Sequence, residues 1–346
     1  MTTLILRESR LDDVQPLNDY ADAQEVVKRA PGSPLAQIEL AFAAAFVLGD
    51  LPQDQRAQVL AIGRNAALRT QALAPDFGEA YVTWCVLHSR ARIAQCESQL
   101  RHAMQIDSSS TWPDWTLASV YIDAGLMQEA VLLAKHSLAR DPFTQMKIAL
   151  RLRTLDATGQ TAEADDLFSR ASRWWPRSDD FFAARISGLI DRGDYAGIER
   201  FEKRIGKADR PSWYEELSPV AAAVRSHSPA GVKTQCPVPG ADTLKSLFCI
   251  SALAQVGELD RAFAIAAERY PSRVGRDAAD EDRIFLAKPF VNGTEYVVGA
   301  GAAPLRRDPR YIALAERVGL LAYWRSGRLP DFCRTAHPED ICSRLR

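Results

Sequence analysis

Two cysteines and two histidines lie close together in the sequence, and these are residue types that ligate zinc. Cys85 and His88 are one helical turn apart, and Cys96 and His102 follow on the next expected helix. His102 lies six residues after Cys96, which places it about 240° around an α-helix, so the two side chains do not converge. We therefore predict no metal site. Two interpretations of Cys85 and Cys96 stay open, namely packing as small residues or a disulfide across a helical hairpin.

Sequence motifs for catalysis are absent as well. Gly299-Ala300-Gly301 lacks the third glycine, the preceding strand and the following helix of a dinucleotide-binding loop, so we interpret it as a turn. The chain has no Gly-x-Ser-x-Gly elbow, no phosphate-binding loop and no paired-histidine metalloprotease motif. We expect no catalytic residue and no cofactor, although catalytic groups can also meet in space without forming a motif.

Aromatic and polar side chains recur at a fixed interval and are the candidate binding residues. Tyr81 and Trp115 are thirty-four residues apart, and Ser119 and Arg153 repeat the same interval, with His88 on the helix of Tyr81. Aromatic anchors beside polar groups suit the binding of an extended or helical peptide. The alternative is that Trp115 packs against the next hairpin, and the sequence leaves both open.

The elements that would position these residues are helical hairpins. In the stretch 112–142, apolar residues follow a helical period, Gly125 interrupts it, and the period then resumes up to Pro142. A shift by thirty-four residues aligns Gly125 with Gly159 and Gly193, and Pro142 with Pro176. Small residues such as Ala118 and Ala130 would let the two helices of a hairpin approach closely.

This layout resembles the tetratricopeptide repeat, which stacks such hairpins into a solenoid. The resemblance implies an all-α fold, an α-solenoid of TPR-like helical hairpins with an irregular C-terminal cap. We expect an N-terminal cap or partial repeat at 1–33 and hairpins at 34–210, with turns at Gly49, near Ala91, and at the three glycines. Degenerate hairpins follow at 211–270, with a Pro- and Gly-rich loop at 226–242, and 271–346 forms an irregular segment and cap.

Composition excludes several classes of partner. Forty-three Lys and Arg balance forty-four Asp and Glu, and no segment concentrates basic residues into a stripe that could follow phosphates, so we expect no direct nucleic acid binding. The longest apolar runs are roughly half of the ~20 residues that a membrane helix needs, so we expect no membrane span. Residues 1–9 also lack the pattern of a signal peptide.

The C-terminal part carries a second and more specific resemblance. Residues 305–333, LRRDPRYIALAERVGLLAYWRSGRLPDFC, contain the Asp-Pro-Arg, Gly-Leu, Tyr-Trp and Pro-Asp-Phe-Cys groups, and Cys342 follows. This pattern is similar to the end of the tetratricopeptide regions in membrane-bound winged-helix transcription regulators of the ToxR-like type, and in related adenylate cyclases, all bacterial. The resemblance implies a sensory or interaction domain on the periplasmic side of the inner membrane. The DNA-binding and membrane segments would then lie outside this chain; without that context, a cytoplasmic location is expected.

The two cysteines of this ending suggest a disulfide. Eight residues separate Cys333 from Cys342, a loop of this size closes readily, and a chain end without repeat contacts would otherwise fray. The ToxR-like resemblance points the same way, because it implies an oxidising compartment. Two free cysteines in a flexible tail remain the alternative, and the pairing of Cys236 and Cys249 is undetermined.

The function expected from these observations is the non-enzymatic binding of a protein or peptide. The partner-binding residues would be Tyr81, His88, Trp115, Ser119 and Arg153. The alternative is an enzyme or a small-ligand pocket formed where residues 271–304 fold over the solenoid. The position of that segment discriminates between the two functions. A position on the outer, convex side favours protein or peptide binding, and a position covering a polar pocket favours an enzyme or a small-ligand site.

Overall fold

The described part of the chain is all-helical. The computed structural model describes residues 16–88, 92–236, 244–270, 294–335 and 341–345, and these ranges contain helices and turns but no strand. The all-α class expected from the helical periodicity is therefore confirmed for these residues.

The chain divides into two compact units, here called unit 1 and unit 2. Among the described residues, unit 1 comprises 16–88 and 92–120, and unit 2 comprises 121–236, 244–270, 294–335 and 341–345. The division falls within the array of hairpins that the thirty-four-residue period predicts, inside the helix α7. Each unit has its own interior, and each is described by itself below.

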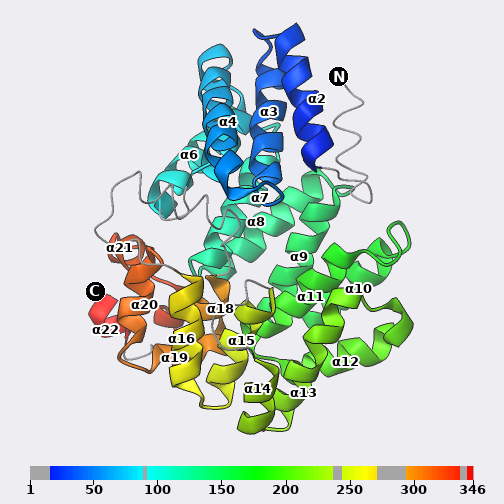
Figure 1. The fold of residues 1–346 in the computed structure, drawn as a ribbon, viewed down its shortest axis with the longest axis vertical. Helices are drawn as coiled ribbons and strands as arrows, with labels where there is room; N and C mark the ends of the chain where they lie inside the picture. The colour runs from blue at the N-terminus through cyan, green and yellow to red at the C-terminus, as the bar shows by residue number, and fades with distance from the viewer. Residues whose placement is uncertain (1–15, 89–91, 237–243, 271–293, 336–340, 346) are drawn as a thin grey trace. The chain divides into compact units, whose positions relative to one another are not determined.

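Unit 1 consists of the helices at the blue and cyan end of the chain (Figure 1). The helices α2, α3 and α4 lie side by side, and α3 also packs against α5. Ser33 caps α3, since its hydroxyl accepts a hydrogen bond from the backbone of Ala36, and Pro34 occupies the first turn. The bounds are α2 (Pro16–Arg29), α3 (Pro34–Val47), α4 (Gln53–Leu73), α5 (Gly78–Val86), α6 (Ile93–Ile106) and α7 (Trp112–Asp123), whose last three residues belong to unit 2.

Unit 2 begins with longer helices and ends with short helical pieces. Its longer helices are α8 (Met127–Arg140), α9 (Gln145–Ala157), α10 (Thr161–Ala171), α11 (Asp179–Arg192), α12 (Tyr195–Ile205), α13 (Ser218–Arg225), α14 (Pro229–Gln235), α15 (Leu244–Gln255) and α16 (Leu259–Arg269). Its C-terminal part is built from short pieces, namely α18 (Glu295–Val298), η5 (Ala300–Ala302), α19 (Ala303–Arg306), α20 (Tyr311–Arg317), α21 (Leu320–Arg325), η6 (Asp331–Cys333) and α22 (Cys342–Leu345). The 3-10 turns η3 (Lys207–Asp209) and η4 (Ser212–Glu216) lead into α13.

The repeated glycines lie where the period places them, between the two helices of successive hairpins. Gly125, Gly159 and Gly193 adopt left-handed backbone angles, with φ of 75°, 81° and 76°. A side chain is strained there, which explains why glycine recurs. The expected turn near Ala91 lies outside the described residues.

The small residues of the repeat are buried, as close helix contacts require. Ala118, Ala130 and Ala164 are each fully buried. Larger apolar side chains fill the interior of each unit, including Leu48, Leu60 and Leu87 in unit 1 and Ile148, Leu152, Leu155 and Phe181 in unit 2. Hydrophobic burial of this kind is the main stabilising term of such arrays.

One local expectation was wrong. Residues 229–235, within the predicted loop at 226–242, form the helix α14, which Ser228 caps through the backbone N–H of Gly231. Within the segment predicted to be irregular, residues 295–298 form the short helix α18. Trp174 is 74% exposed, whereas its neighbour Trp175 packs edge-on against Phe181.

Candidate functional site

Three aromatic rings meet within unit 1 and form what we call the aromatic cluster: Phe42, Trp112 and Trp115. Trp112 and Trp115 are three residues apart at the start of α7, so they share one face, and their rings meet edge to face with centroids 5.6 Å apart. The ring of Phe42 on α3 lies 6.0 Å from that of Trp112. All three side chains are half-buried, so each keeps part of its ring surface exposed.

The helix α3 presents the aromatic cluster on its less buried face. Ile38, Leu40, Ala41, Ala44 and Val47 turn into the interior of unit 1. Glu39 and Phe42 are three residues apart on the opposite face and are half-buried, while Phe46, one turn further, is 46% exposed. The helical period of α3 therefore separates a packing face from a face that carries aromatic and acidic groups.

Two carboxylates accompany these rings. Burial raises the pKa of Glu39, and no hydrogen bond or ion pair joins its carboxylate to another side chain in the described ranges. Glu79 on α5 accepts a hydrogen bond of 2.6 Å from the hydroxyl of Ser110, and the same hydroxyl accepts one of 3.4 Å from the backbone of Trp112. The second oxygen of Glu79, Oε2, is buried and has no hydrogen-bond partner among the described residues. The aromatic cluster is therefore flanked by negative charge.

Of the predicted binding residues, Tyr81 and His88 contact their own hairpin. The Tyr81 ring meets the His102 ring edge-on at 5.0 Å, and its hydroxyl donates to the carbonyl of Pro75. The imidazole of His88, just beyond the end of α5, stacks on Trp84 with centroids 4.1 Å apart. Both side chains therefore pack against residues of their own hairpin.

Ser119 and Arg153 also have local partners. The Ser119 hydroxyl donates to the carbonyl of Trp115 one turn earlier on α7. Arg153 lies in unit 2, where its guanidinium donates to the buried carboxylate of Asp191 at 3.0 Å and so links α9 to α11. Trp115 is thus the one predicted residue that lies in the aromatic cluster. The period of thirty-four residues did not indicate Phe42, Trp112, Glu39 or Glu79, although the i, i+3 spacing of the two tryptophans was a visible signal.

The cysteines are paired, which decides between the alternatives that the sequence left open. Cys85 is bonded to Cys96 between α5 and α6, with Cα atoms 5.2 Å apart, and Cys236 is bonded to Cys249, with Cα atoms 5.6 Å apart. The third disulfide joins Cys333 to Cys342. Within the described ranges, no group of three or more His, Cys, Asp or Glu side chains forms a metal-binding arrangement. Three structural disulfides point to an oxidising environment.

In unit 2, the face of α11 and α15 is covered by residues of the same chain. The helix α18 and the turn η5 pack directly on α11 and α15, and Tyr296, Val297 and Val298 are buried there. The Tyr296 hydroxyl lies 3.4 Å from that of Ser187, and the Thr294 hydroxyl donates to the carbonyl of Asp123. The segment 271–293 lies outside the described residues.

The C-terminal segment 305–335 also packs within unit 2. The buried indole of Trp324 donates from Nε1 to the carbonyl of Ala124, at 2.9 Å. The Arg306 guanidinium donates to the carbonyls of Val298 and Gly299 and lies 4.4 Å from the ring centre of Phe332, in a cation–π arrangement. Trp324, Arg306 and Phe332, which belong to this run, therefore contribute to packing within unit 2.

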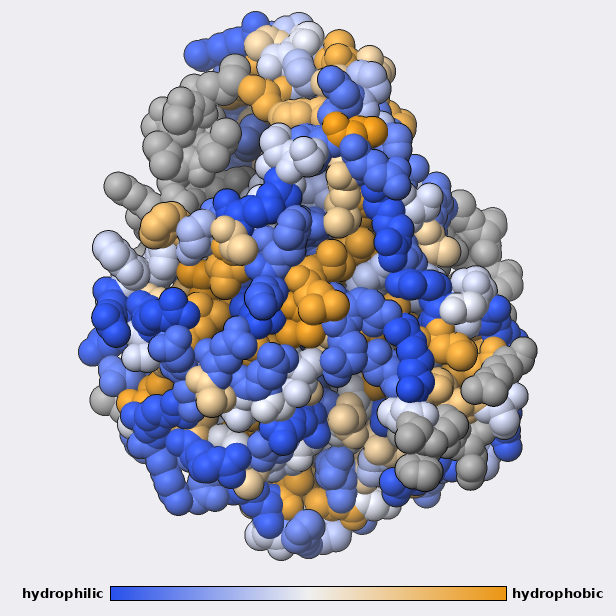
Figure 2. All heavy atoms as spheres, turned by 180° about the vertical axis from the view of Figure 1, so that it is seen from behind, coloured by the Kyte–Doolittle hydropathy of each residue, from blue (hydrophilic) through white to orange (hydrophobic). Residues whose placement is uncertain are grey.

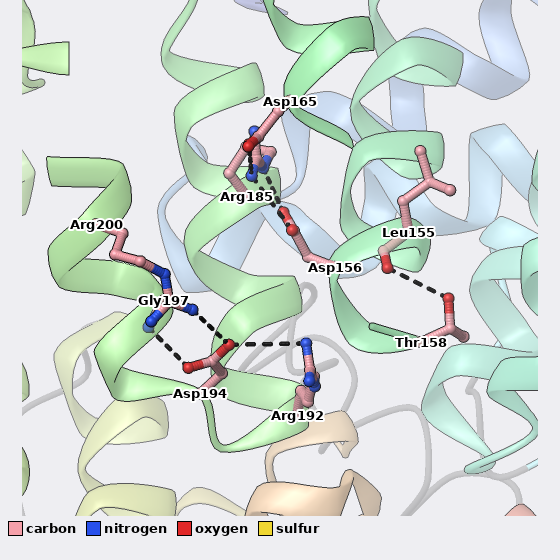
Figure 3. Close-up of polar contacts among 9 residues, drawn as sticks. All are labelled: Leu155, Asp156, Thr158, Asp165, Arg185, Arg192, Asp194, Gly197 and Arg200. Carbon is pink, nitrogen blue, oxygen red and sulfur yellow. Dashed lines mark hydrogen bonds and ion pairs between the residues drawn. The ribbon is translucent and has the colours of Figure 1, made fainter. Parts of the chain in front are cut away.

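An ionic network connects α9, α10, α11 and α12, and Figure 3 shows its members Asp156, Asp165 and Arg185. Arg185 donates to the carboxylates of both Asp156 and Asp165, and Arg204 also bonds Asp165, at 2.8 Å. Burial is the largest effect on Asp156 and, with the nearby Asp165 charge, outweighs the attraction of Arg185, so its pKa rises from 3.8 to about 6. Because these charged groups pair with one another, we interpret the network as one that stabilises the packing of the helices.

The surface offers hydrophobic groups in several places. On the face shown in Figure 2, hydrophobic residues reach the surface in groups separated by hydrophilic ones. The large exposed hydrophobic side chains include Phe46 and Leu68 in unit 1, and Leu132, Phe143 and Trp174 in unit 2. Among these side chains, Phe46 lies one turn from the aromatic cluster on α3, beside Glu39, which has no ion-pair partner among the described residues. The aromatic cluster is therefore the best candidate site.

No known family model matches this chain, and no characterised protein matches it at a significant level of sequence similarity. None of the described helices combines the length and apolar character that a membrane span requires.

Proposed function

We propose that this chain is a solenoid of TPR-like hairpins that binds a protein or peptide through the aromatic cluster of unit 1. The observation that carries the proposal is the contact of Phe42 on α3 with Trp112 on α7, seventy residues later. Each of these helices is the first helix of its hairpin. Stacked hairpins gather their first helices on one surface. Half-buried tryptophans that keep exposed ring surface are typical anchors for a partner.

The regular hairpins and the periodic glycine turns support the solenoid arrangement. In unit 2, the segment 294–306 packs on α11 and α15 and covers them. In unit 1, the first helices α3 and α7 carry half-buried aromatic rings that a partner could contact. The contacts of Arg153 with Asp191 assign that residue to the packing of unit 2, and Tyr81, His88 and Ser119 would border the site.

The proposal extends to a place in signalling. The three disulfides suit an oxidising compartment, and the tail resembles that of ToxR-like regulators, whose repeats lie outside the cytoplasmic membrane. We propose that the chain is the sensing or interaction part of such a regulator, on the periplasmic side of a bacterial inner membrane.

A displayed library of random peptides, panned against the oxidised protein, tests the binding function. Peptides selected on the wild type should lose at least about tenfold in affinity for Trp115→Ala, because anchors of this kind often contribute more than 1 kcal/mol. Trp174→Ala removes an exposed tryptophan of unit 2 and is the matched control. Equal binding to the wild type and to a folded Trp115→Ala variant would overturn the assignment of the surface.

A further inference from the structure

The aromatic cluster has a chemical preference that its geometry and charges define. The faces of aromatic rings carry negative potential, and indole rings carry the strongest, so rings that meet at an angle favour a cation between or above them. Trp112 and Trp115 meet at 83°, and Phe42 is inclined at 46° to Trp112. The three exposed ring surfaces therefore do not offer a single flat stacking plane.

The neighbouring carboxylates of Glu39 and Glu79 also favour a cation at the aromatic cluster. Glu39 stands one helical turn before Phe42 on the same face of α3, half-buried and without an ion-pair partner in the described ranges. The raised pKa of its carboxyl reflects the cost of holding its charge away from water. A cation placed beside Glu39 would offset that cost, which an apolar or anionic group could not do.

Glu79 adds a second unsatisfied acceptor. One of its oxygens is engaged by Ser110, whose hydroxyl also contacts the backbone of Trp112, and the other is buried without a hydrogen-bond donor among the described residues. Buried carboxylate oxygens are normally satisfied, so this one is a candidate acceptor for an N–H group from outside the unit. An arginine or lysine side chain carries such donors at the end of a long stem.

We propose that the aromatic cluster binds a cationic side chain, preferably an arginine, of the partner polypeptide, with its charge balanced by Glu39 and Glu79. The planar guanidinium stacks on aromatic rings and donates to carboxylates at the same time, which an ammonium does less well. This inference rests on the proposed function and narrows it to partners that present arginine or lysine at the contact.

The direct probes are two short peptides, acetyl-Gly-Arg-Gly-amide and its citrulline counterpart, which has nearly the same shape but no charge. They are titrated into the oxidised wild-type protein, and the indole N–H resonances of Trp112 and Trp115 are followed by NMR. The arginine peptide should shift both resonances with a saturable dependence on concentration. The citrulline peptide should bind at least about fivefold more weakly.

Charge-neutral variants locate the effect. Glu39→Gln should weaken the arginine peptide about fivefold and leave the citrulline peptide unchanged. Asp54→Asn removes an exposed carboxylate from the first turn of α4 and controls for overall charge, so it should bind like the wild type. Glu79→Gln serves as a second variant if Glu39→Gln alters the fold.

The outcomes separate this inference from the proposed function. If both peptides shift the two indole resonances equally, the cluster binds peptides without regard to charge, and the inference falls while the binding function stands. If neither peptide shifts them, the cationic preference is refuted. The panning experiment with Trp115→Ala then remains the separate test of the binding function. Equal weakening in Glu39→Gln and Asp54→Asn would reduce the effect to general electrostatics and also overturn the inference.

Discussion

The carboxylate of Asp331 accepts a hydrogen bond of 2.9 Å from the backbone N–H of Gln128, 203 residues earlier in the chain. Gln128 lies in the first turn of α8, where backbone N–H groups lack partners within the helix, so a residue from the C-terminal end caps a helix near the start of unit 2. The backbone N–H of Asp331 also donates to the carbonyl of Gly125. The ends of unit 2 are thus joined by a reciprocal pair of contacts.

Removing this distant cap should destabilise the protein. Asp331→Ala loses the acceptor for Gln128 and the negative charge at the helix start, so the free energy of unfolding should fall by about 1 kcal/mol. Chemical denaturation of the oxidised protein measures it. Asp331→Asn keeps an acceptor and should lose less; if the alanine variant matches the wild type, the hydrogen bond contributes nothing.

Gly193 should tolerate a side chain less well than Gly257, although both have left-handed backbones with φ of 76° and 83°. A Cβ atom at Gly193 would lie 3.1 Å from the Cα of Gly301, whereas a Cβ at Gly257 would meet nothing within 4 Å. Gly257→Ala should therefore cost only the conformational term, about 1 kcal/mol. Gly193→Ala should cost more, and equal melting temperatures for the two variants would contradict the close packing of η5 on this turn.

The Cys333–Cys342 disulfide should stabilise unit 2 by closing the C-terminal tail. The bond spans a sequence separation of nine, for which the loop-entropy model gives on the order of 2–3 kcal/mol. Replacing both cysteines with serine should lower the unfolding free energy by about that amount. Thiol titration of the denatured, non-reduced wild type should find no free thiol, and six would refute all three disulfides.

Asp156 should make stability depend on pH between about 4 and 6. Its pKa is 3.8 in the unfolded chain and about 6 in the folded one, so the folded state binds more protons in this window. The unfolding free energy contributed by this group should therefore fall as pH rises from about 4 to 6, by on the order of 3 kcal/mol.

The measurement is urea denaturation at a series of pH values, together with NMR titration of the Asp156 carboxyl carbon. Asp156→Asn should remove the fall in stability, because the amide resembles the protonated acid. Asp166→Asn, at an exposed position on the neighbouring helix α10, should preserve it. A titration midpoint near 4 for Asp156 would refute the raised pKa.

The local elements of this protein could be predicted from its sequence. Ser33 and Pro34 marked the start of α3, the glycines marked turns with left-handed backbones, and the alanine positions of the repeat proved to be buried. Each of these features is determined by a few consecutive residues, because helix capping, backbone conformation and helix–helix approach depend on near neighbours in the sequence. The missed helices α14 and α18 are short pieces in segments with many Pro, Gly or Val residues, where local preferences favour no single structure.

Contacts between distant segments were decided by the tertiary structure alone. The pairing of Cys236 with Cys249, the contact of Phe42 with Trp112 and the capping of α8 by Asp331 each join positions that no periodicity links. The same holds for Arg153, which the repeat placed in a binding row and which Asp191 engages inside unit 2. A residue's place on a helix follows from the helical period, but its partner across the interior depends on how whole helices pack, and that is a property of the folded chain.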